Sequence, residues 1–321
     1  MKRTFFYLTC ILIMSLMLAG CASKSNNKEV AQPSQEYLRI TDDAGKMVVL
    51  AKKPERIVVL STSLLDLLYG VGGQAIGKPS SKTPAMFPAS KNATDIGFVY
   101  NVNIEQVVAL QPDLVIGFQG IHEKMIPILE SSHIPVIMLK MKTYDDVLAK
   151  MKLFGDIAGT PEKAQSVMEQ MQSEVQKVTA KLPAQNKKVV ILHATAKNVT
   201  VELDKSIAGG IANMLALQNI AVGSKPIDGD SDIAPYSLEK LVEGDADVIL
   251  VVTMGNIEEI KKRMTADISS NPAWAGLRAV KEGQIFFLPS ELFQLNPGLR
   301  FPESVAYMAN VVYPEVYSNA Q

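Results

Sequence analysis

Residues 103–115 read NIEQVVALQPDLV, and residues 237–249 read SLEKLVEGDADVI. Each stretch begins with a polar residue, an apolar residue and a glutamate (Glu105 or Glu239), and each has an aspartate at the same offset before a β-branched run. This pattern predicts a short helix that leads into a buried strand. Because the unit occurs in both halves of the chain, we expect two lobes of like topology.

Strand patterns alternate with helix patterns around both units. RIVVL (56–60) predicts a buried strand, and Ser61 and Thr62 follow it directly before an apolar helix pattern, where we expect hydroxyl side chains to cap the helix. KVVILHA (188–194) begins the second half in the same way. Alternating strands and helices imply parallel sheets. The sequence therefore predicts an α/β fold with two Rossmann-like lobes, each a parallel sheet flanked by helices.

A helical segment separates the two halves. Residues 143–182 contain no strand pattern, and a Gly-Thr-Pro break divides them, where we expect Thr160 to cap a second helix and Pro161 to begin it. We interpret this segment as a long helical linker between the lobes. The predicted organisation is a lipoprotein signal peptide with lipobox (1–21), a flexible tether (22–36), an N-terminal α/β lobe (37–142), the helical linker (143–183) and a C-terminal α/β lobe (184–321).

The N-terminal residues have the layout of a secretory signal, with a basic start and a short apolar run that ends in small residues. LAGC (18–21) resembles the lipobox of bacterial lipoproteins, which implies cleavage before Cys21 and lipid modification of that cysteine. The alternatives are an ordinary signal peptide and an uncleaved anchor helix. The following Ser, Asn, Lys and Gln residues predict a flexible tether. We therefore expect an exported protein that a lipid anchors to the outer face of the cytoplasmic membrane, at the cell surface or in a periplasm.

Composition excludes several classes of function. Of the two cysteines, Cys10 lies in the predicted signal and Cys21 is the predicted anchor, so disulfides, thiolate catalysis and cysteine-held metal sites are excluded for the body. A net charge of −1 offers no basic field for nucleic acid. The G-x-S-x-G, H-E-x-x-H, G-x-G-x-x-G and P-loop patterns do not occur, and the three histidines lie on separate segments. These findings disfavour a hydrolytic or metal-dependent enzyme and a zinc or manganese site.

These features together resemble the substrate-binding lipoproteins of ABC importers for iron–siderophore complexes, haem and cobalamin. The stretches RIVVLSTS, NIEQVVALQPDLVIG and NPAWAGLRAVKEGQIFFLP carry the resemblance, which covers essentially the whole mature chain. It implies a ligand cleft between the lobes and, as partners, an ABC permease dimer with its ATPase subunits. It also implies that Glu105 and Glu239 each pair with arginines of one permease subunit. The alternative is that both are first-turn carboxylates favoured by the helix dipole.

Within that family, the stretches RIVVLSTSLLDLL, TMGNIEEIKKRM and SELFQLNPGLR most resemble the staphylococcal haem-binding lipoproteins. Haem is therefore the first expected ligand, with a cobalamin or other corrinoid and a ferric siderophore as alternatives, and no catalytic cofactor is expected. Tyr100 and Met254 stand where those relatives have axial Met and His ligands. Phenolate suits ferric iron, whereas thioether is weaker there, so Met254 is a distal ligand or a packing residue. The alternative for Tyr100 is that its ring stacks on the ligand. For a corrinoid, Phe98 and Tyr100 suit the aromatic and hydroxyl contacts that would hold it.

Other candidates for ligand contact come from single residues. His122 follows a glycine at a strand end, where we expect it to contact the ligand or coordinate iron. His193 ranks below it, and His133, in a turn, is expected to be structural. Arg300 is a partner for a carboxylate such as a haem propionate, with a surface arginine as the alternative. The hydroxyl residues at 61–63 are placed to donate to an anionic group, although capping alone explains them.

Overall fold

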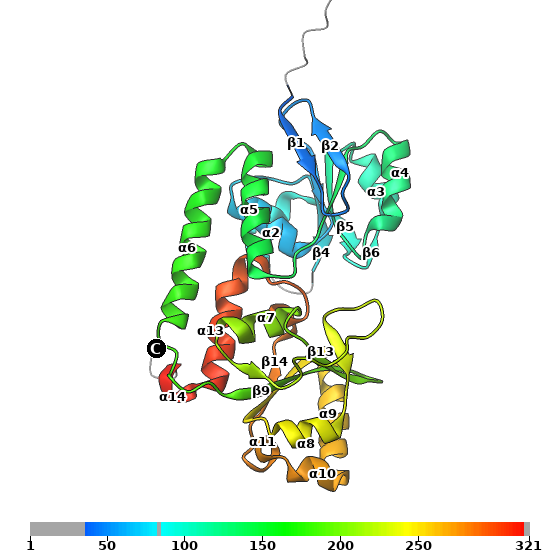
Figure 1. The fold of residues 1–321 in the computed structure, drawn as a ribbon. Coiled ribbons are helices and arrows are strands. Elements are labelled where there is room, and N and C mark those ends of the chain that lie inside the picture. The colour runs from blue at the N-terminus through cyan, green and yellow to red at the C-terminus, as the bar shows by residue number, and fades with distance from the viewer. Residues whose placement is uncertain (1–35, 82–84, 318–321) are drawn as a thin grey trace, which may run out of the picture. The chain divides into compact units, whose positions relative to one another are not determined.

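A computed structural model describes residues 36–81 and 85–317 of the chain. The described residues form a two-stranded sheet of β1 and β2 and two six-stranded sheets, and Figure 1 shows helices packed around the larger sheets. The first lobe contains β1 (Leu38–Thr41), β2 (Met47–Leu50), β3 (Ile57–Val59), α2 (Thr62–Gly70), β4 (Gly77–Ser80), η1 (Pro88–Asn92), β5 (Thr94–Phe98), β6 (Asn101–Val102), α3 (Ile104–Ala109), β7 (Leu114–Phe118), η2 (Glu123–Met125), α4 (Ile126–Ser131) and β8 (Val136–Leu139). Two helices follow it, α5 (Tyr144–Ala158) and α6 (Pro161–Thr179).

The second lobe begins after these helices. It contains β9 (Lys188–Thr195), β10 (Val199–Glu202), α7 (Ile207–Met214), β11 (Gln218–Asn219), β12 (Ile233–Pro235), α8 (Leu238–Gly244), β13 (Val248–Met254), α9 (Ile257–Ser270), α10 (Pro272–Gly276), α11 (Arg278–Lys281), β14 (Ile285–Leu288), α12 (Ser290–Phe293), η3 (Gly298–Arg300), α13 (Phe301–Val312) and α14 (Pro314–Tyr317). The predicted α/β fold with two lobes and connecting helices is confirmed.

The two sheets share a parallel centre and differ at one edge. The first sheet has the order β6-β5-β4-β3-β7-β8, and all its strands are parallel except β6. The second has the order β12-β10-β9-β13-β14, with β11 also pairing with β9. In this sheet β10 runs antiparallel to both β9 and β12. The antiparallel pair of β10 and β12 was not predicted, because its strands are short and partly polar.

The central ladders of the two sheets have the same register. Ile57 of β3 lies opposite Leu114 of β7, and Val189 of β9 lies opposite Val248 of β13. Ile57 thus corresponds to Val189, and Leu114 corresponds to Val248. Counting on from the first of these matches, residue 61 of the first lobe corresponds to residue 193 of the second. The predicted repeat is therefore present in the strand pairing as well as in the order of the elements.

The connecting helices begin and end largely as the sequence predicts. Thr143 and Asp146 form a capping box at the start of α5, an arrangement worth about 1 kcal/mol. Gly159 ends α5 in the left-handed conformation (φ 68°), which glycine adopts without strain, and Pro161 begins α6. The predicted cap by Thr160 is wrong, because its hydroxyl donates to the Val71 carbonyl oxygen at 2.7 Å instead. The domain boundaries given above stay a prediction.

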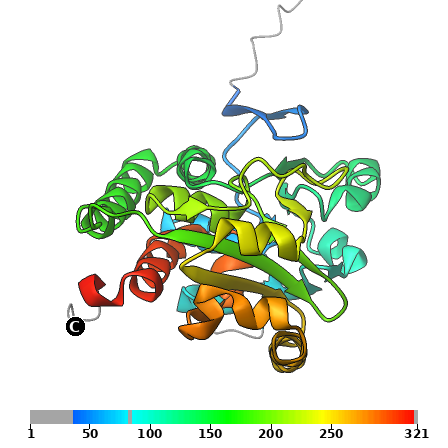
Figure 2. The same cartoon turned by 60° about the horizontal axis from the view of Figure 1, so that its bottom comes forward.

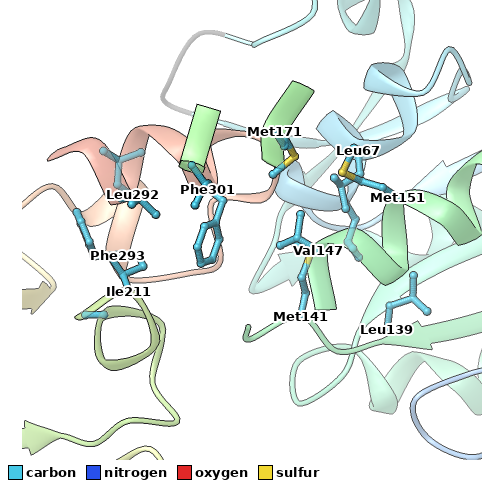
Figure 3. Close-up of a cluster of buried hydrophobic side chains, with 14 of the residues drawn as sticks. Leu67, Leu139, Met141, Val147, Met151, Met171, Ile211, Leu292, Phe293 and Phe301 are labelled. Atoms are coloured by element: carbon cyan, nitrogen blue, oxygen red, sulfur yellow. The ribbon is translucent and has the colours of Figure 1, made fainter. Parts of the chain in front are cut away.

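One buried apolar cluster contains residues from both sheets and from the connecting helices. Figure 3 shows Met151 of α5 and Met171 of α6 near Leu67 of α2, and Phe301 of α13 beside them. Figure 2 shows α5 and α6 in green on the same side as α13 in red. Helices that cross from one sheet to the other thus bury their apolar faces in a shared core. Such shared packing favours small relative movements of the lobes.

Candidate functional site

The two glutamate-bearing helices begin in the same way. Asn103 at the start of α3 accepts a hydrogen bond from the backbone N–H of Gln106 at 3.1 Å, and Ser237 at the start of α8 accepts one from Lys240 at 3.4 Å. Glu105 and the equivalent glutamate of α8, Glu239, lie exposed in the first turn of these helices. Within residues 36–81 and 85–317, neither carboxylate has a hydrogen bond or an ion pair.

An arginine binds the carboxyl end of each of these helices. In the first lobe, the Arg56 guanidinium donates to the carbonyl oxygens of Leu110 (2.6 Å) and Gln111 (3.0 Å). In the second, the Arg278 guanidinium donates to the carbonyl oxygen of Asp245 at 2.8 Å. Gln111 and Asp245 are equivalent residues, and both have positive φ angles, of 47° and 44°. Cations at this end also complement the helix dipole.

The repeated aspartates link the end of each helix to the start of a neighbouring strand through hydrogen bonds. The Asp113 carboxylate accepts hydrogen bonds from the backbone N–H groups of Glu55 (2.8 Å) and Arg56 (2.9 Å) just before β3. The Asp247 carboxylate accepts one from Lys188, the first residue of β9, at 2.7 Å, and also pairs with Arg278. The sequence showed the aspartates but not the arginines, because Arg56 precedes its helix whereas Arg278 follows it.

Exposed apolar side chains occur at the carboxyl ends of strands in both lobes. Ten large apolar side chains are exposed among the described residues. Phe98 and Met254 end β5 and β13, Tyr100 lies just beyond β5, and Met86 and Leu295 lie in the segments that follow β4 and β14. The other five lie in the hairpin β1–β2, in α4, in α8 and after β11. Apolar groups left in water at the strand ends of both sheets are a typical lining for an apolar ligand.

Two of these side chains stand on the turn between β5 and β6. Phe98 is 50% exposed and Tyr100 is 61% exposed. The turn is tight, since a Cβ atom on Gly97 (φ 94°) would lie 2.5 Å from the Asn101 carbonyl oxygen. Among the described residues, the Tyr100 hydroxyl has no hydrogen-bond partner. Both rings are therefore available to a ligand, as the sequence predicts, and their roles stay a prediction.

Met254 is the last residue of β13 and is 46% exposed. It lies opposite Thr195, the last residue of β9, so it stands at the carboxyl end of two adjacent parallel strands. Gly255 follows with a φ of 124°, where the chain turns towards α9. This position suits either a weak iron ligand or an adaptable apolar contact.

The structure does not support the prediction for His122. Its side chain is fully buried, its Nδ1 accepts a hydrogen bond from the backbone N–H of Phe118, and its Nε2 lies 2.8 Å from the carbonyl oxygen of Val99. Burial lowers the pKa of His122, so the neutral ring is favoured. Because both ring nitrogens are occupied, His122 fixes the chain after β7 and has no lone pair for iron.

Ser61 and Thr62 lie at the start of α2, but the predicted cap is wrong. The Ser61 side chain accepts no hydrogen bond from the helix backbone, and its hydroxyl instead lies 3.2 Å from that of Ser63. Ser61 is buried and Thr62 is partly exposed. A role of these hydroxyls towards an anionic group stays a prediction.

Arg300 has a carboxylate partner within its own lobe. Its guanidinium forms two hydrogen bonds with the Glu303 carboxylate, at 2.7 and 2.8 Å, and this pairing raises the pKa of Arg300 and lowers that of Glu303. Burial raises the pKa of the neighbouring Asp66 in α2 to about 6, and the charge of Arg300 partly opposes this. A ligand carboxylate would therefore compete with Glu303 for Arg300.

Two lysines near the strand ends are also paired. The Nζ atom of Lys78 lies 3.5 Å from Oδ2 of Asp95. Lys142 forms an ion pair with Asp232, and this pair links the turn before α5 to the loop before β12. The pKa of Asp95 is lowered, and the largest cause is the hydrogen bond that its carboxylate accepts from the Ser80 hydroxyl. These carboxylates neutralise the lysines, which would otherwise attract an anionic ligand.

Cys21 lies outside the described residues, so the anchor remains a prediction. Of the helices in residues 36–81 and 85–317, none has both the length and the apolar character needed to cross a membrane. The described residues also contain no cluster of three or more His, Cys, Asp or Glu side chains that is arranged to hold a metal ion.

The fold, the paired lobes and the apolar strand ends define a substrate-binding protein of a transport system. The model of the periplasmic binding protein family matches residues 57–292, and the chain belongs to this family. The iron(III)-citrate-binding protein YfmC of Bacillus subtilis is 23% identical over 306 residues, which cover 93% of each chain. The chain is therefore a substrate-binding protein of ABC transport and not an enzyme.

Two further comparisons concern one staphylococcal protein. The high-affinity heme uptake system protein IsdE of Staphylococcus aureus (strain MRSA252) is 23% identical over 317 residues, which cover 98% of this chain and 99% of IsdE. The crystal structure of IsdE complexed with heme is similar in fold, with a TM-score of 0.70 and 22% identity. The match covers 80% of this chain and 98% of that one.

Proposed function

We propose that this chain is the extracytoplasmic substrate-binding lipoprotein of an ABC importer, and that it captures haem or a related iron complex. The observation that carries the proposal is that exposed apolar side chains stand at strand ends of both sheets, Phe98 and Tyr100 in one and Met254 in the other. Burying such a surface against a largely apolar ligand stabilises the complex by about 25 cal/mol per Å². In this proposal the two sets of strand ends line one cleft.

Haem is the favoured ligand because of the side chains at these ends. The rings of Phe98 and Tyr100 suit stacking on a macrocycle, and the Tyr100 phenolate is a donor for ferric iron. Lys78, Lys142 and Arg300 are already paired with carboxylates, which disfavours a strongly anionic complex. Ferric citrate and ferric siderophores are the second candidates, supported by the similarity to YfmC.

Glu105 and Glu239 are the proposed contacts with the permease. They are exposed, unpaired among the described residues, and held on helices that Arg56, Arg278 and the repeated aspartates fix in the same way in both lobes. Opposite charges at an interface favour encounter and register more than affinity. Two equivalent carboxylates would suit a partner with two equivalent subunits. Lipid attachment at Cys21 would keep the protein beside that partner.

The test is a visible absorption titration of the purified protein with haem, a cobalamin, ferric citrate and a ferric siderophore in parallel. We expect a saturable Soret shift at one equivalent of haem, and in the Tyr100→Phe variant we expect an altered ferric spectrum and weaker binding. Phe87→Leu, a change in a ring that stacks on Tyr69 in the first lobe, serves as the matched control. Retention of ferric citrate or a siderophore without a haem response would overturn the choice of haem, and no response to any of the four would overturn the proposed function.

A further inference from the structure

His193 lies on the strand that is central to the second lobe. Its Cα lies opposite Val252 of β13 and Thr200 of β10, two residues before β9 ends. Side chains alternate between the faces of a strand, so His193 shares a face with Val252 and with Met254, which is two residues further along β13. His193 and Met254 are therefore neighbours at the carboxyl ends of adjacent strands.

A buried carboxylate binds one nitrogen of this ring. The His193 Nδ1 lies 3.0 Å from Oε1 of Glu202, whose side chain is only 6% exposed, whereas the His193 side chain is 22% exposed. Within the described part of the chain, Nε2 has no hydrogen-bond partner, and it is not among the buried polar atoms that lack one. The ring therefore turns Nδ1 inwards to Glu202 and exposes Nε2.

Glu202 is itself held in place by the antiparallel edge of the second sheet. It ends β10 opposite Ile233 of β12, and its carbonyl oxygen accepts a hydrogen bond from the Asn219 side chain at 2.8 Å. A carboxylate fixed in this way selects the Nδ1–H tautomer and leaves the Nε2 lone pair free. Histidines that bind metal ions commonly have this second partner, which orients the ring and raises its basicity.

The other two histidines lack this arrangement. Both nitrogens of His122 are bonded to backbone groups, and His133 lies exposed in the turn before β8 with a φ of 58°. His193 is therefore the histidine whose geometry leaves a nitrogen for a ligand at the strand ends, although the sequence ranked it below His122.

We propose that His193 Nε2 is the donor that the second lobe presents to the iron of the transported complex, and that Glu202 is its positioning residue. This inference rests on the proposed function. Met254 then packs beside the ligand as an apolar contact. Imidazole is a stronger ligand than thioether for ferric iron, so His193 is the better donor of the two neighbours.

The first test compares ferric haem binding by the full mature chain and its variants. His193→Ala should weaken binding at least about tenfold and alter the ferric electron paramagnetic resonance spectrum, and added imidazole should restore that spectrum. Glu202→Gln should weaken binding about 10- to 100-fold. His133→Asn, which removes an imidazole where asparagine tolerates the positive φ, is the control and should match the wild type.

The second test needs no ligand. In ¹⁵N-resolved NMR of the ligand-free protein near neutral pH, His193 should be the Nδ1–H tautomer, and Glu202→Gln should shift it away from that tautomer. A protonated Nε2 would overturn the proposal whatever the ligand is. An unchanged haem spectrum in His193→Ala would overturn it while the proposed function stands, and a wild-type protein that binds no iron complex would overturn both.

Discussion

The two lobes share one scaffold and differ at one equivalent position. In the first lobe β3 ends at Val59 and the chain enters α2 after Ser61, whereas in the second β9 continues to Thr195 and turns back as β10. Ser61 and His193 are thus equivalent, but only His193 lies in a β-hairpin that brings a buried carboxylate to it. The helices that bear Glu105 and Glu239 are each held by an arginine at the carboxyl end and by an aspartate that binds the start of the neighbouring strand. The features proposed for docking are duplicated, and those proposed for ligand binding are not.

In the proposed function, a physical difference between the two partners would account for this pattern. A permease dimer would present the same surface twice, so both lobes would need the same exposed carboxylate in the same setting. An iron complex offers two faces that need not be alike, so the strand ends of the two lobes are free to differ. Phe98 and Tyr100 stand at one set of ends, and His193 and Met254 stand at the other.

The largest expected effect is the loss of ligand uptake when both exposed glutamates, Glu105 and Glu239, are replaced. Glu105→Arg combined with Glu239→Arg should abolish uptake of the ligand by cells or proteoliposomes, because both charge contacts with the permease are reversed, while ligand affinity should be unchanged. Glu243→Arg, at an exposed position one turn further along α8, is the control and should leave uptake near the wild-type level. Loss of affinity in the double variant would place these glutamates in the ligand site instead.

The aspartates that fasten the two helices provide a test of the shared scaffold. Asp113→Ala and Asp247→Ala should each lower the free energy of unfolding by about 0.5–1.5 kcal/mol, because the backbone N–H groups at the start of β3 and β9 lose their acceptor. Asp247→Ala should lower the free energy of unfolding at least as much as Asp113→Ala does, because Arg278 also loses an ion-pair partner. Urea denaturation measures both, with the exposed Asp228→Ala as control. A value no greater than the control for either aspartate would show that the two lobes are not fastened alike.

Asp66 gives a smaller, pH-dependent effect at a contact between α2 and the segment that contains Arg300. Its pKa is raised from 3.8 to about 6, so the folded protein holds this proton more tightly than the unfolded chain does. The resulting stability is present at low pH and is lost as the pH rises through about 6. Asp66→Asn should therefore raise the free energy of unfolding at pH 7.5 by about 1–2 kcal/mol, allowing for partial exposure, and change it little at pH 4.

Denaturation curves at both pH values measure this difference. Asp228→Asn, a fully comparable change at an exposed site, should have no effect at either pH. Equal effects of Asp66→Asn at pH 4 and pH 7.5 would contradict the raised pKa.

Local patterns in the sequence predicted most of the fold. The apolar runs 56–60 and 188–194 and the repeated unit gave the parallel ladders, because strand and helix periodicities are local properties. The short strands β10 and β12 were missed, since they depend on pairing with each other and with β9. Local patterns did not place Phe98, because β5, which ends at this residue, was expected to be loop, and Met254 was singled out by the family resemblance.

The orientation of single side chains could not be predicted in this way. His122 follows a strand pattern and His193 lies near the end of one, but the partners of their ring nitrogens lie four to 23 residues away along the chain. The partner of Arg300 was closer, at Glu303, but the sequence alone did not distinguish it from a ligand carboxylate. Tertiary contacts thus decided which candidates stay available to a ligand.

The central claim is that one ligand contacts the strand ends of both lobes while the docking helices stay exposed. Hydrogen–deuterium exchange of the full mature chain, with and without haem, tests it most directly. We predict slower exchange on haem binding in residues 96–102 and in residues 193–199 and 252–256, with no change in the first turns of α3 and α8. Protection confined to one lobe, or protection of the docking helices in place of the strand ends, would contradict the account.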